Sequence, residues 1–185
     1  MGFRFLDTEL DYFDHPYNDT IHNERAIEVA IALYWLDRHG AGLEVGNVLG
    51  HYGLTGHRVV DLHEEAPGVE NIDVFDITGS YDWIVAISTV EHVGRDEEPK
   101  DPDAAERAIC HLRSLLAPDG YMLVTVPGGY HPVLDQALPT IGADVACTYR
   151  RSPSGWERTD GLCFLPYGSS TQWAESVWVG MWSPA

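Results

Sequence analysis

The residues best suited to chemistry in this sequence surround a glycine-rich turn and the acidic end of the next apolar segment. Residues 42–53 read GLEVGNVLGHYG, where an apolar run enters a turn through Glu44, Gly46 and Gly50, and a second run ends at Asp61. Glycine lets backbone N–H groups approach a ligand, and a carboxylate at the tip of the following strand accepts hydrogen bonds from both ribose hydroxyls. The pattern predicts a nucleoside-binding site formed by a strand, a tight turn and a second strand.

Short apolar segments recur along the chain and are typical of an α/β domain. Their uninterrupted apolar character predicts parallel strands that are covered on both faces of a sheet. The connections at 50–57, 63–70 and 77–81 are brief, so the covering helices there are expected to be abbreviated or absent. The predicted strands are LEV (43–45), RVVDL (58–62), NIDVFDI (71–77), DWIVAIS (82–88), YMLVTVP (121–127), VACTY (145–149) and SVWVGMW (176–182).

Helices are predicted where apolar residues recur with helical spacing. The first begins at a cap formed by Asn18 or Thr20 and runs to about Arg38. Two more are predicted within residues 101–116 and 131–140. The polar face of the first helix is interpreted as solvent-exposed, with a lid over a ligand as the functional alternative; this face carries Asn23, Glu24 and Arg25.

The composition describes an acidic globular protein. Among its 185 residues, 29 acids against 11 bases give a formal charge of −18, which argues against a nucleic-acid-binding surface and against docking on anionic lipid. Three distant cysteines without a CxxC pair exclude a disulfide framework and suit a reducing cytoplasm, and no segment reads as a signal peptide or a membrane span. Residues 1–185 are expected to form one domain, with residues 1–19 as an irregular arm whose aromatic side chains pack on it.

The order of these elements resembles that of class I S-adenosylmethionine-dependent methyltransferases, over roughly residues 20–182. The resemblance is nearest to small-molecule and sugar methyltransferases of bacterial biosynthetic clusters. It implies a Rossmann-like, seven-stranded, mostly parallel sheet with helices on both faces, in which the last strand, residues 176–182, runs antiparallel. The matching blocks are LEVGNVLG (43–50), VVDL (59–62), ENIDV (70–74), YDWIVAISTVEHVG (81–94) and LRSLLAPDGYMLVTVP (112–127).

The resemblance also implies S-adenosyl-L-methionine as cofactor and a small molecule, such as a sugar or another hydroxylated metabolite, as methyl acceptor. One departure concerns Val48, which stands where the family usually has a further glycine; its side chain either crowds the cofactor or points into the sheet. The implied cofactor-binding residues are Glu44, Gly46, Asn47 and Gly50 at the methionyl group, Asp61 and Leu62 at the ribose and adenine, Asp73 and Val74 at the adenine, and Ile87 and Ser88 beneath the cofactor.

His92 and Glu91 are the candidate catalytic residues. Methyl transfer from a sulfonium is an in-line displacement, so the protein mainly positions the reactants and excludes water, but an oxygen or nitrogen acceptor often also needs a base. His92, with an ordinary pKa of about 6.5, follows the fourth strand, where the methyl group is expected to project. Glu91 would orient His92 or hold an acceptor hydroxyl; the alternative is a structural Glu-His pair that caps the next loop. Because Ser88 replaces the first glutamate of the Glu-x-x-Glu-His metal cluster of related enzymes, no metal site is predicted.

Other readings of the chain stay open at this point. A non-catalytic relative that serves as a binding or scaffold module is suggested by Val48 and the short connections, and a dinucleotide oxidoreductase is disfavoured because the GxGxxG spacing is absent. Arg150 and Arg151 either bind an acidic group of the acceptor or pair with surface acids. Further loop residues that would join the acceptor or donor side are His131, His51 and Tyr52.

Overall fold

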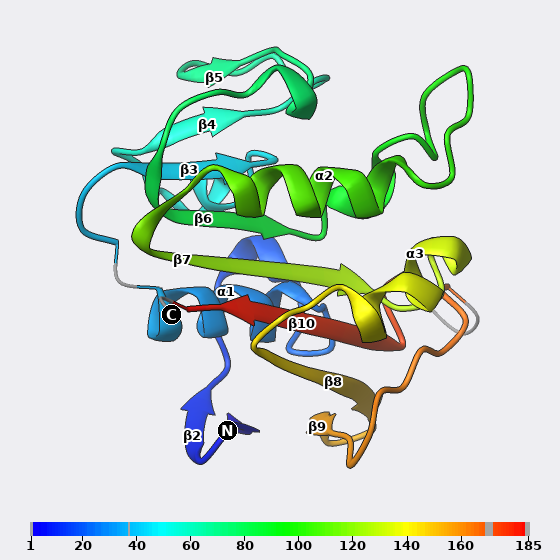
Figure 1. Ribbon diagram of the computed structural model, residues 1–185. Helices are drawn as coiled ribbons and strands as arrows, with labels where there is room; N and C mark the ends of the chain where they lie inside the picture. Colours follow the sequence, from blue (N-terminus) through cyan, green and yellow to red (C-terminus); the bar gives the residue numbers. More distant parts are fainter. Residues whose placement is uncertain (1, 37, 169–171, 184–185) are drawn as a thin grey trace.

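The computed structural model describes residues 2–36, 38–168 and 172–183, which build one large sheet with helices on both faces (Figure 1). Neighbouring strands run parallel from β5 through β4, β3 and β6 to β7, whereas β10 runs antiparallel to both β7 and β8. This arrangement confirms the predicted Rossmann-like sheet with its antiparallel last strand and adds β9 as an eighth strand, paired with β8. In their order across the sheet, the strands are β5 (Val69–Glu70), β4 (Arg58–Val60), β3 (Gly42–Val45), β6 (Tyr81–Ile87), β7 (Leu116–Pro127), β10 (Ser176–Trp182), β8 (Val145–Ser152) and β9 (Gly155–Arg158).

Each face of the sheet packs against different helices, because side chains alternate along the central strand β6. Val85 belongs to the buried cluster beneath α1 (Arg25–Trp35). Its neighbour Ile84 belongs to the opposite cluster, beneath α2 (Ala104–Ser114) and α3 (Pro132–Ala137), which lie on the other face of the sheet (Figure 1). The three predicted helices therefore exist, each shorter than expected. Within the described residues, no helix has both the length and the apolar character that a membrane span requires.

Several connections of the sheet contain short 3-10 helices in place of longer α-helices. The expected abbreviation of the connections at 50–57, 63–70 and 77–81 is confirmed, because among the described residues these connections hold no α-helix, and only η2 and η3 lie in or beside them. A cavity lies where the parallel strands end. The 3-10 turns are η1 (Pro16–Asn18), η2 (Leu49–Tyr52), η3 (Val74–Asp76), η4 (Val90–His92) and η5 (Leu138–Thr140).

The third predicted strand is misplaced. Residues 71–77 were expected to be extended, but the strand pairs with β4 only at Val69–Glu70. The side chain of Asp73 accepts a hydrogen bond from the backbone N–H of Phe75 (2.9 Å) and so begins a turn. Because aspartate competes for backbone donors in this way, it ends the strand early and places its own carboxylate at the sheet edge.

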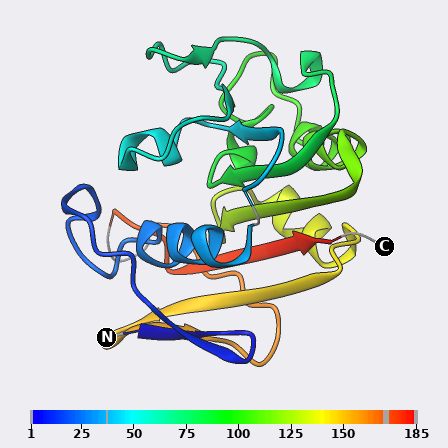
Figure 2. The same ribbon diagram turned by 90° about the vertical axis from the view of Figure 1, so that its left-hand side faces the viewer.

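The arm expected to be irregular at residues 1–19 contains a regular hairpin, formed by β1 (Gly2–Phe5) and β2 (Thr8–Asp11). The hairpin lies against β9 at the far side of the sheet (Figure 2). Phe3 and Phe5 are buried there, which confirms the predicted packing of aromatic side chains for these two, whereas Tyr17 in the same arm is largely exposed.

The first helix begins at Arg25, later than the predicted cap at Asn18 or Thr20. Asp19 has a φ of 63°, in the left-handed region, which interrupts a right-handed helix. The side chain of Asn18 does not cap the helix, because its Oδ1 accepts a hydrogen bond from the hydroxyl of Tyr52 (2.6 Å) while its Nδ2 donates to the carbonyl oxygen of Phe13 (2.7 Å). The chain between the hairpin and α1 is thus fixed by side-chain contacts instead of by an extra helical turn.

Candidate functional site

A cavity of about 550 Å³ lies at the carboxyl ends of β3, β4 and β6. Its volume falls within the range of about 300–1,000 Å³ that is usual for small-molecule sites, and its place is where ligands bind in open parallel sheets. The predicted site residues that line it are Gly46, Asn47, Asp61, Leu62, Asp73, Val74, Ser88 and His92. The predicted residues that do not line it are Glu44, Gly50, Ile87 and Glu91.

Glu44 organises the turn after β3. Its side chain is fully buried, and Oε1 accepts a hydrogen bond from the backbone N–H of Leu49 (2.6 Å), while Oε2 lies 2.7 Å from Nε2 of His57. Glu44 was expected either to organise this turn or to reach the methionyl amine, and the geometry matches the structural role, because its oxygens are taken by Leu49 and His57 and it does not line the cavity. His57 carried no signal in the sequence, because its contact with Glu44 depends on the pairing of β3 with β4.

Gly46 is required at its position by the close approach of the chain after β6. Its φ is 84°, and a Cβ atom there would lie 2.1 Å from Oγ1 of Thr89. The N–H of Gly46 donates to the carbonyl oxygen of Val60 (2.8 Å), which ties the turn to β4. Any other residue here would be strained and would collide, so the turn is fixed in shape before a ligand arrives.

Asn47, Val48 and Gly50 complete the turn. Nδ2 of Asn47 donates to Oε1 of Glu64 (2.6 Å), and a Cβ on Gly50 would lie 2.1 Å from Oδ1 of Asn47, so Gly50 makes room for that side chain. Val48 has a φ of −81°, which any residue adopts, and it packs against the apolar cluster under α1 while also lining the cavity. The departure from the usual glycine is therefore accommodated without strain.

Asp61 stands at the end of β4, on the cavity wall. Its Oδ1 accepts hydrogen bonds from the backbone N–H groups of His63 (2.8 Å) and Glu64 (2.7 Å), which fix the orientation of the carboxylate. Oδ2 makes no hydrogen bond to another residue that the structure describes. Leu62 and Val74 add apolar surface to the same part of the cavity.

Ile87 and Ser88 follow one another at the end of β6 but have different surroundings. Ile87 is fully buried in the apolar cluster under α1. The expected contact of its side chain with the cofactor is therefore wrong, and the side chain instead packs behind the cavity wall. Ser88 lines the cavity and has a φ of 41°, a conformation that costs a non-glycine residue roughly 1–3 kcal/mol. Its Oγ donates to Oε1 of Glu28 (2.6 Å), which links β6 to α1.

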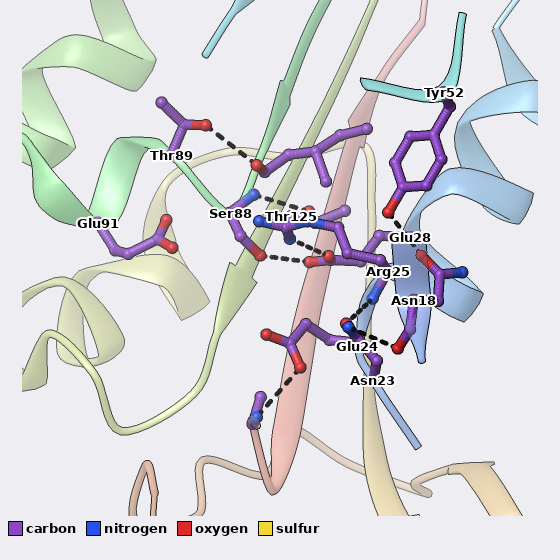
Figure 3. A network of polar contacts seen from close by, with 12 residues as sticks. Asn18, Asn23, Glu24, Arg25, Glu28, Tyr52, Ser88, Thr89, Glu91 and Thr125 are labelled. Atoms are coloured by element: carbon purple, nitrogen blue, oxygen red, sulfur yellow. Dashed lines mark hydrogen bonds and ion pairs between the residues drawn. The ribbon is translucent and has the colours of Figure 1, made fainter. Parts of the chain in front are cut away.

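A buried ionic network occupies the start of α1, beside the cavity (Figure 3). Arg25 Nη1 lies 2.5 Å from Oε2 of Glu28, whose side chain is fully buried, and Glu24 accepts a hydrogen bond from the backbone N–H of Ala174 (3.2 Å). The interpretation of this helix face as solvent-exposed was wrong, because Ser88 and Ala174 supply donors from distant parts of the chain. The signal that could have revealed it is the glutamate within the apolar run AIEVAI.

The charges in this network perturb one another. Burial raises the pKa of Glu24, and the neighbouring Glu28 adds to the rise. Although burial disfavours the charged form of Arg25, Glu28 and Glu24 together raise its pKa. Arg25 therefore stays a cation, whereas Glu24 is shifted toward its neutral form.

His92 lines the cavity from η4, with 48% of its side chain exposed. Nδ1 lies 2.5 Å from Oδ2 of Asp96, and the hydroxyl of Tyr130 donates to the same oxygen (2.7 Å). Although partial burial of Asp96 acts in the other direction, the hydrogen bonds from His92 and Tyr130 lower its pKa. Asp96, which the sequence did not single out, is thus the carboxylate that orients the imidazole.

Glu91 lies behind His92 and outside the cavity wall. Its side chain is 1% exposed, its Oε1 is 3.7 Å from Nε2 of His92, and burial raises its pKa well above the ordinary value. A separation of 3.7 Å is too long for a hydrogen bond, so Glu91 does not orient the imidazole in the way that was considered.

The other polar residues singled out in the sequence have structural partners. His131 is buried and caps α3, where its Nδ1 accepts a hydrogen bond from the N–H of Leu134 (3.1 Å) and burial lowers its pKa. Arg150 pairs with Glu157 (3.0 Å) at the surface, which confirms its interpretation as the partner of a surface acid. Arg151 also pairs with an acid, Glu175, but both side chains are largely buried. The loop residues His51 and Tyr52 contact Glu64 and Asn18 respectively. Among the described residues, no group of three or more His, Cys, Asp or Glu side chains is arranged to hold a metal ion.

No protein-family model matches this sequence, and the curated proteins contain no match. Solved structures do resemble the chain. A possible histamine N-methyltransferase from Thermotoga maritima is 14% identical, with 86% of this chain and 88% of that chain covered and a TM-score of 0.53. The 1,6-didemethyltoxoflavin-N1-methyltransferase from Burkholderia thailandensis, solved with 1,6-didemethyltoxoflavin and S-adenosylhomocysteine, is 16% identical, with 97% and 98% covered and a TM-score of 0.52.

These similarities define the class of fold. At such low identity a likeness shows the fold alone, and that fold is the class I S-adenosylmethionine-dependent methyltransferase fold. The resemblance seen in the order of the sequence blocks is therefore confirmed at the level of architecture.

Proposed function

We propose that the protein transfers a methyl group from S-adenosyl-L-methionine to a small-molecule acceptor. The observation that carries this proposal is the joint presence, in one cavity of about 550 Å³, of the Gly46 turn after β3 and the Asp61 carboxylate after β4. Two structural neighbours of the same fold are described as small-molecule methyltransferases, one of them with S-adenosylhomocysteine bound.

The residues of the cavity fit the chemistry of the cofactor. Oδ2 of Asp61 is the acceptor that ribose hydroxyls need, and Leu62 and Val74 offer apolar surface for the adenine ring. Asp73 would accept a hydrogen bond from the adenine amino group, and Gly46 would let the backbone approach the methionyl part. When bound, the cofactor supplies a methyl group activated by a sulfonium, so the residues around it need only bind, orient and exclude water.

On the acceptor side, His92 serves as the base. With Nδ1 hydrogen-bonded to Asp96, the ring presents Nε2 as the nitrogen that takes a proton from an acceptor hydroxyl or amine. Ser88 and Arg25 line the cavity beside it and offer further polar contacts. The acceptor is a small hydroxylated molecule, of which a sugar is one example.

Calorimetric titration with S-adenosylhomocysteine and S-adenosylmethionine tests the proposal. Binding of both, together with release of S-adenosylhomocysteine in the presence of small acceptors, is the expected result. Binding without turnover across a broad acceptor panel would instead favour a non-catalytic binding module, and the absence of any binding would overturn the proposal. The unstrained backbone of Val48 weakens one of the two reasons for the non-catalytic alternative, although its side chain does line the cavity.

A further inference from the structure

The contact between His92 and Asp96 joins two side chains that are each about half exposed. Nδ1 of His92 lies 2.5 Å from Oδ2 of Asp96, and the two side chains are 48% and 44% exposed. Charged pairs at the surface contribute little on their own, because solvent screens them and both side chains must give up freedom. The pair would therefore hold the imidazole only loosely unless another residue fixed the carboxylate.

Tyr130 fixes that carboxylate. Its hydroxyl donates a hydrogen bond to Oδ2 of Asp96 (2.7 Å) and lies 3.1 Å from Nδ1 of His92, and the rings of Tyr130 and His92 pack with their centroids 4.8 Å apart. Oδ2 of Asp96 thus accepts from two donors at once. Tyr130 itself does not line the cavity, but both residues that it contacts in this way do. Its influence on a reaction in the cavity would therefore pass through them.

The loop after β7 places Tyr130 beside η4. In this loop Gly129 has a φ of 78°, and a Cβ atom there would lie 2.2 Å from the carbonyl oxygen of Leu165, so only glycine allows the two segments to approach so closely. The N–H of Gly129 donates to Oδ2 of Asp135 (2.9 Å). The loop is thus fixed by its neighbours, and it brings Tyr130 to His92 although 38 positions separate them in the chain.

The ring of Tyr130 is held by two further side chains. The guanidinium of Arg95 lies over the ring, with Cζ 4.9 Å from the centroid, and Tyr167 packs edge to face at a centroid distance of 5.2 Å. Burial raises the pKa of Tyr130 to about 12, and the hydrogen bond to Asp96 adds to the rise. At neutral pH the hydroxyl therefore keeps its proton and remains a donor to Asp96.

Glu91 is the other carboxyl group near the imidazole, and it does not share this role. It lies 3.7 Å from Nε2 of His92, too far for a hydrogen bond, and burial raises its pKa well above the ordinary value. Despite partial burial, the hydrogen bonds from His92 and Tyr130 lower the pKa of Asp96. The ionised partner of the imidazole is therefore Asp96, on the Nδ1 side of the ring.

We propose that Tyr130 is a positioning residue for His92: by holding Asp96 against Nδ1, it keeps the neutral ring in the Nδ1–H tautomer and leaves Nε2 free to take a proton from the acceptor. This inference rests on the proposed function and deepens it, because it names a residue on which the base depends. The hydrogen bond at one ring nitrogen decides which nitrogen carries the proton. In the Nε2–H tautomer, Nε2 has no lone pair with which to accept one.

Nitrogen-15 NMR of the histidine side chains tests the inference on the full chain without any ligand. At about pH 8.5 an ordinary imidazole is neutral, and its two nitrogen signals report which of them carries the proton. His92 is expected to be mainly in the Nδ1–H tautomer in the wild type. In Tyr130→Phe, which keeps the ring and removes only the hydroxyl, the ratio of the Nδ1–H to the Nε2–H tautomer should fall about fivefold or more, the scale of one hydrogen bond to a charged group.

Tyr34→Phe is the matched control. It removes the hydroxyl of a tyrosine on α1 that shares a hydrogen bond with Thr8 (3.2 Å) outside the cavity, and it should leave the ratio unchanged. Because Tyr130 acts through Asp96, adding Tyr130→Phe to Asp96→Asn should change the ratio by less than about twofold. A ratio that Tyr130→Phe leaves unchanged, or lowers equally in both backgrounds, would overturn the inference, and the single variant decides even if Asp96→Asn fails to fold.

Turnover connects the tautomer to the reaction. At saturating S-adenosylmethionine, Tyr130→Phe should lower the turnover number about threefold or more, while the affinity for S-adenosylhomocysteine stays within about twofold. A shifted tautomer ratio with wild-type turnover would overturn the role of Tyr130 in the reaction. Absence of turnover in the wild type, with the tautomer ratio responding as expected, would instead overturn the proposed function.

Discussion

The cavity has two sides that satisfy their polar groups in different ways. The turn side is formed by the segments after β3 and β4, and the helix side by the start of α1 and by η4. On the turn side, Glu44 and Asp61 have oxygens that are hydrogen-bonded to backbone N–H groups of the same segment or its neighbour. On the helix side, Glu24 and Glu91 are buried with raised pKa values, and Glu91 has no hydrogen bond to another described residue. The difference teaches that the turn side has its polar groups satisfied without a ligand, whereas the helix side keeps a buried carboxyl group without hydrogen bonds, at an energetic cost.

Glu44→Ala tests most severely whether the turn side is preformed. The change leaves the N–H of Leu49 and the ring of His57 buried without their partner, so the free energy of unfolding should fall by about 3–5 kcal/mol. Urea unfolding measures it. The control is Glu64→Ala at the half-exposed rim, expected to cost less than about 1 kcal/mol. Equal losses in the two variants would contradict the special role of Glu44.

His92→Ala addresses the chemistry on the helix side. Loss of a positioned base should lower the turnover number about 100-fold or more, while the affinity for S-adenosylhomocysteine stays within about twofold. Fixed-time assays of S-adenosylhomocysteine release measure turnover, and calorimetry measures the affinity for S-adenosylhomocysteine. Asp96→Asn should lower turnover less, since the imidazole remains but is less firmly oriented. Wild-type turnover in His92→Ala would remove this residue from the mechanism.

Asp61→Ala probes ligand binding on the turn side. Two buried ribose hydroxyls would lose their acceptor, so binding of S-adenosylhomocysteine should weaken by about 1–3 kcal/mol. Calorimetric titration gives the value, with circular dichroism as a check on folding. The same titration on Asp76→Ala, whose side chain lies outside the cavity, should show no change. An unaltered affinity in Asp61→Ala would discard the assignment of the ribose site.

The pH dependence of the free energy of unfolding should show what the burial of the Glu91 carboxyl group costs, and this is the smallest effect that we expect. Burial raises the pKa of Glu91 in the folded state. At a pH below the pKa of the unfolded carboxyl, Glu91 is neutral in both states and does not lower the free energy of unfolding. As the pH rises through the folded-state pKa, the protein loses this stability. Glu91→Gln removes that loss, so its free energy of unfolding relative to wild type should increase from pH 5 to pH 8. A constant difference across this range would mean that Glu91 ionises freely in the folded protein.

Continuous apolar segments made most of the sheet predictable, since a strand buried on both faces has no polar positions to confuse the pattern. The hairpin at residues 2–11 was not predictable in the same way, because its turn passes through Leu6 with a φ of 50° and lacks the glycine or asparagine that normally marks such a turn. The hairpin therefore carried no turn signal that local reasoning recognises.

The turn side of the cavity was predictable for a related reason. The spacing of the glycine turn and of the acid at the end of the next strand is recognisable in the sequence, and the contacts of Asp61 with His63 and Glu64 are local. The contacts that fix Glu44 and Gly46 come partly from other strands, so the spacing records these residues but not their partners. The helix side was not predictable, because the burial of Glu24 depends on the N–H of Ala174, which lies 150 positions away in the chain. No local pattern can report a partner at that separation.

The strained backbone at Ser88 limits what melting temperatures can show about variants at this position. A glycine there would release the backbone strain of roughly 1–3 kcal/mol, while losing the hydrogen bond to Glu28 costs about 1–3 kcal/mol, so the two changes nearly cancel. An alanine would keep the strain and lose the bond. A survey that scores mutants by melting temperature would therefore record glycine as silent at this position, although the hydrogen bond that links the covering helix to the end of the central strand would be lost.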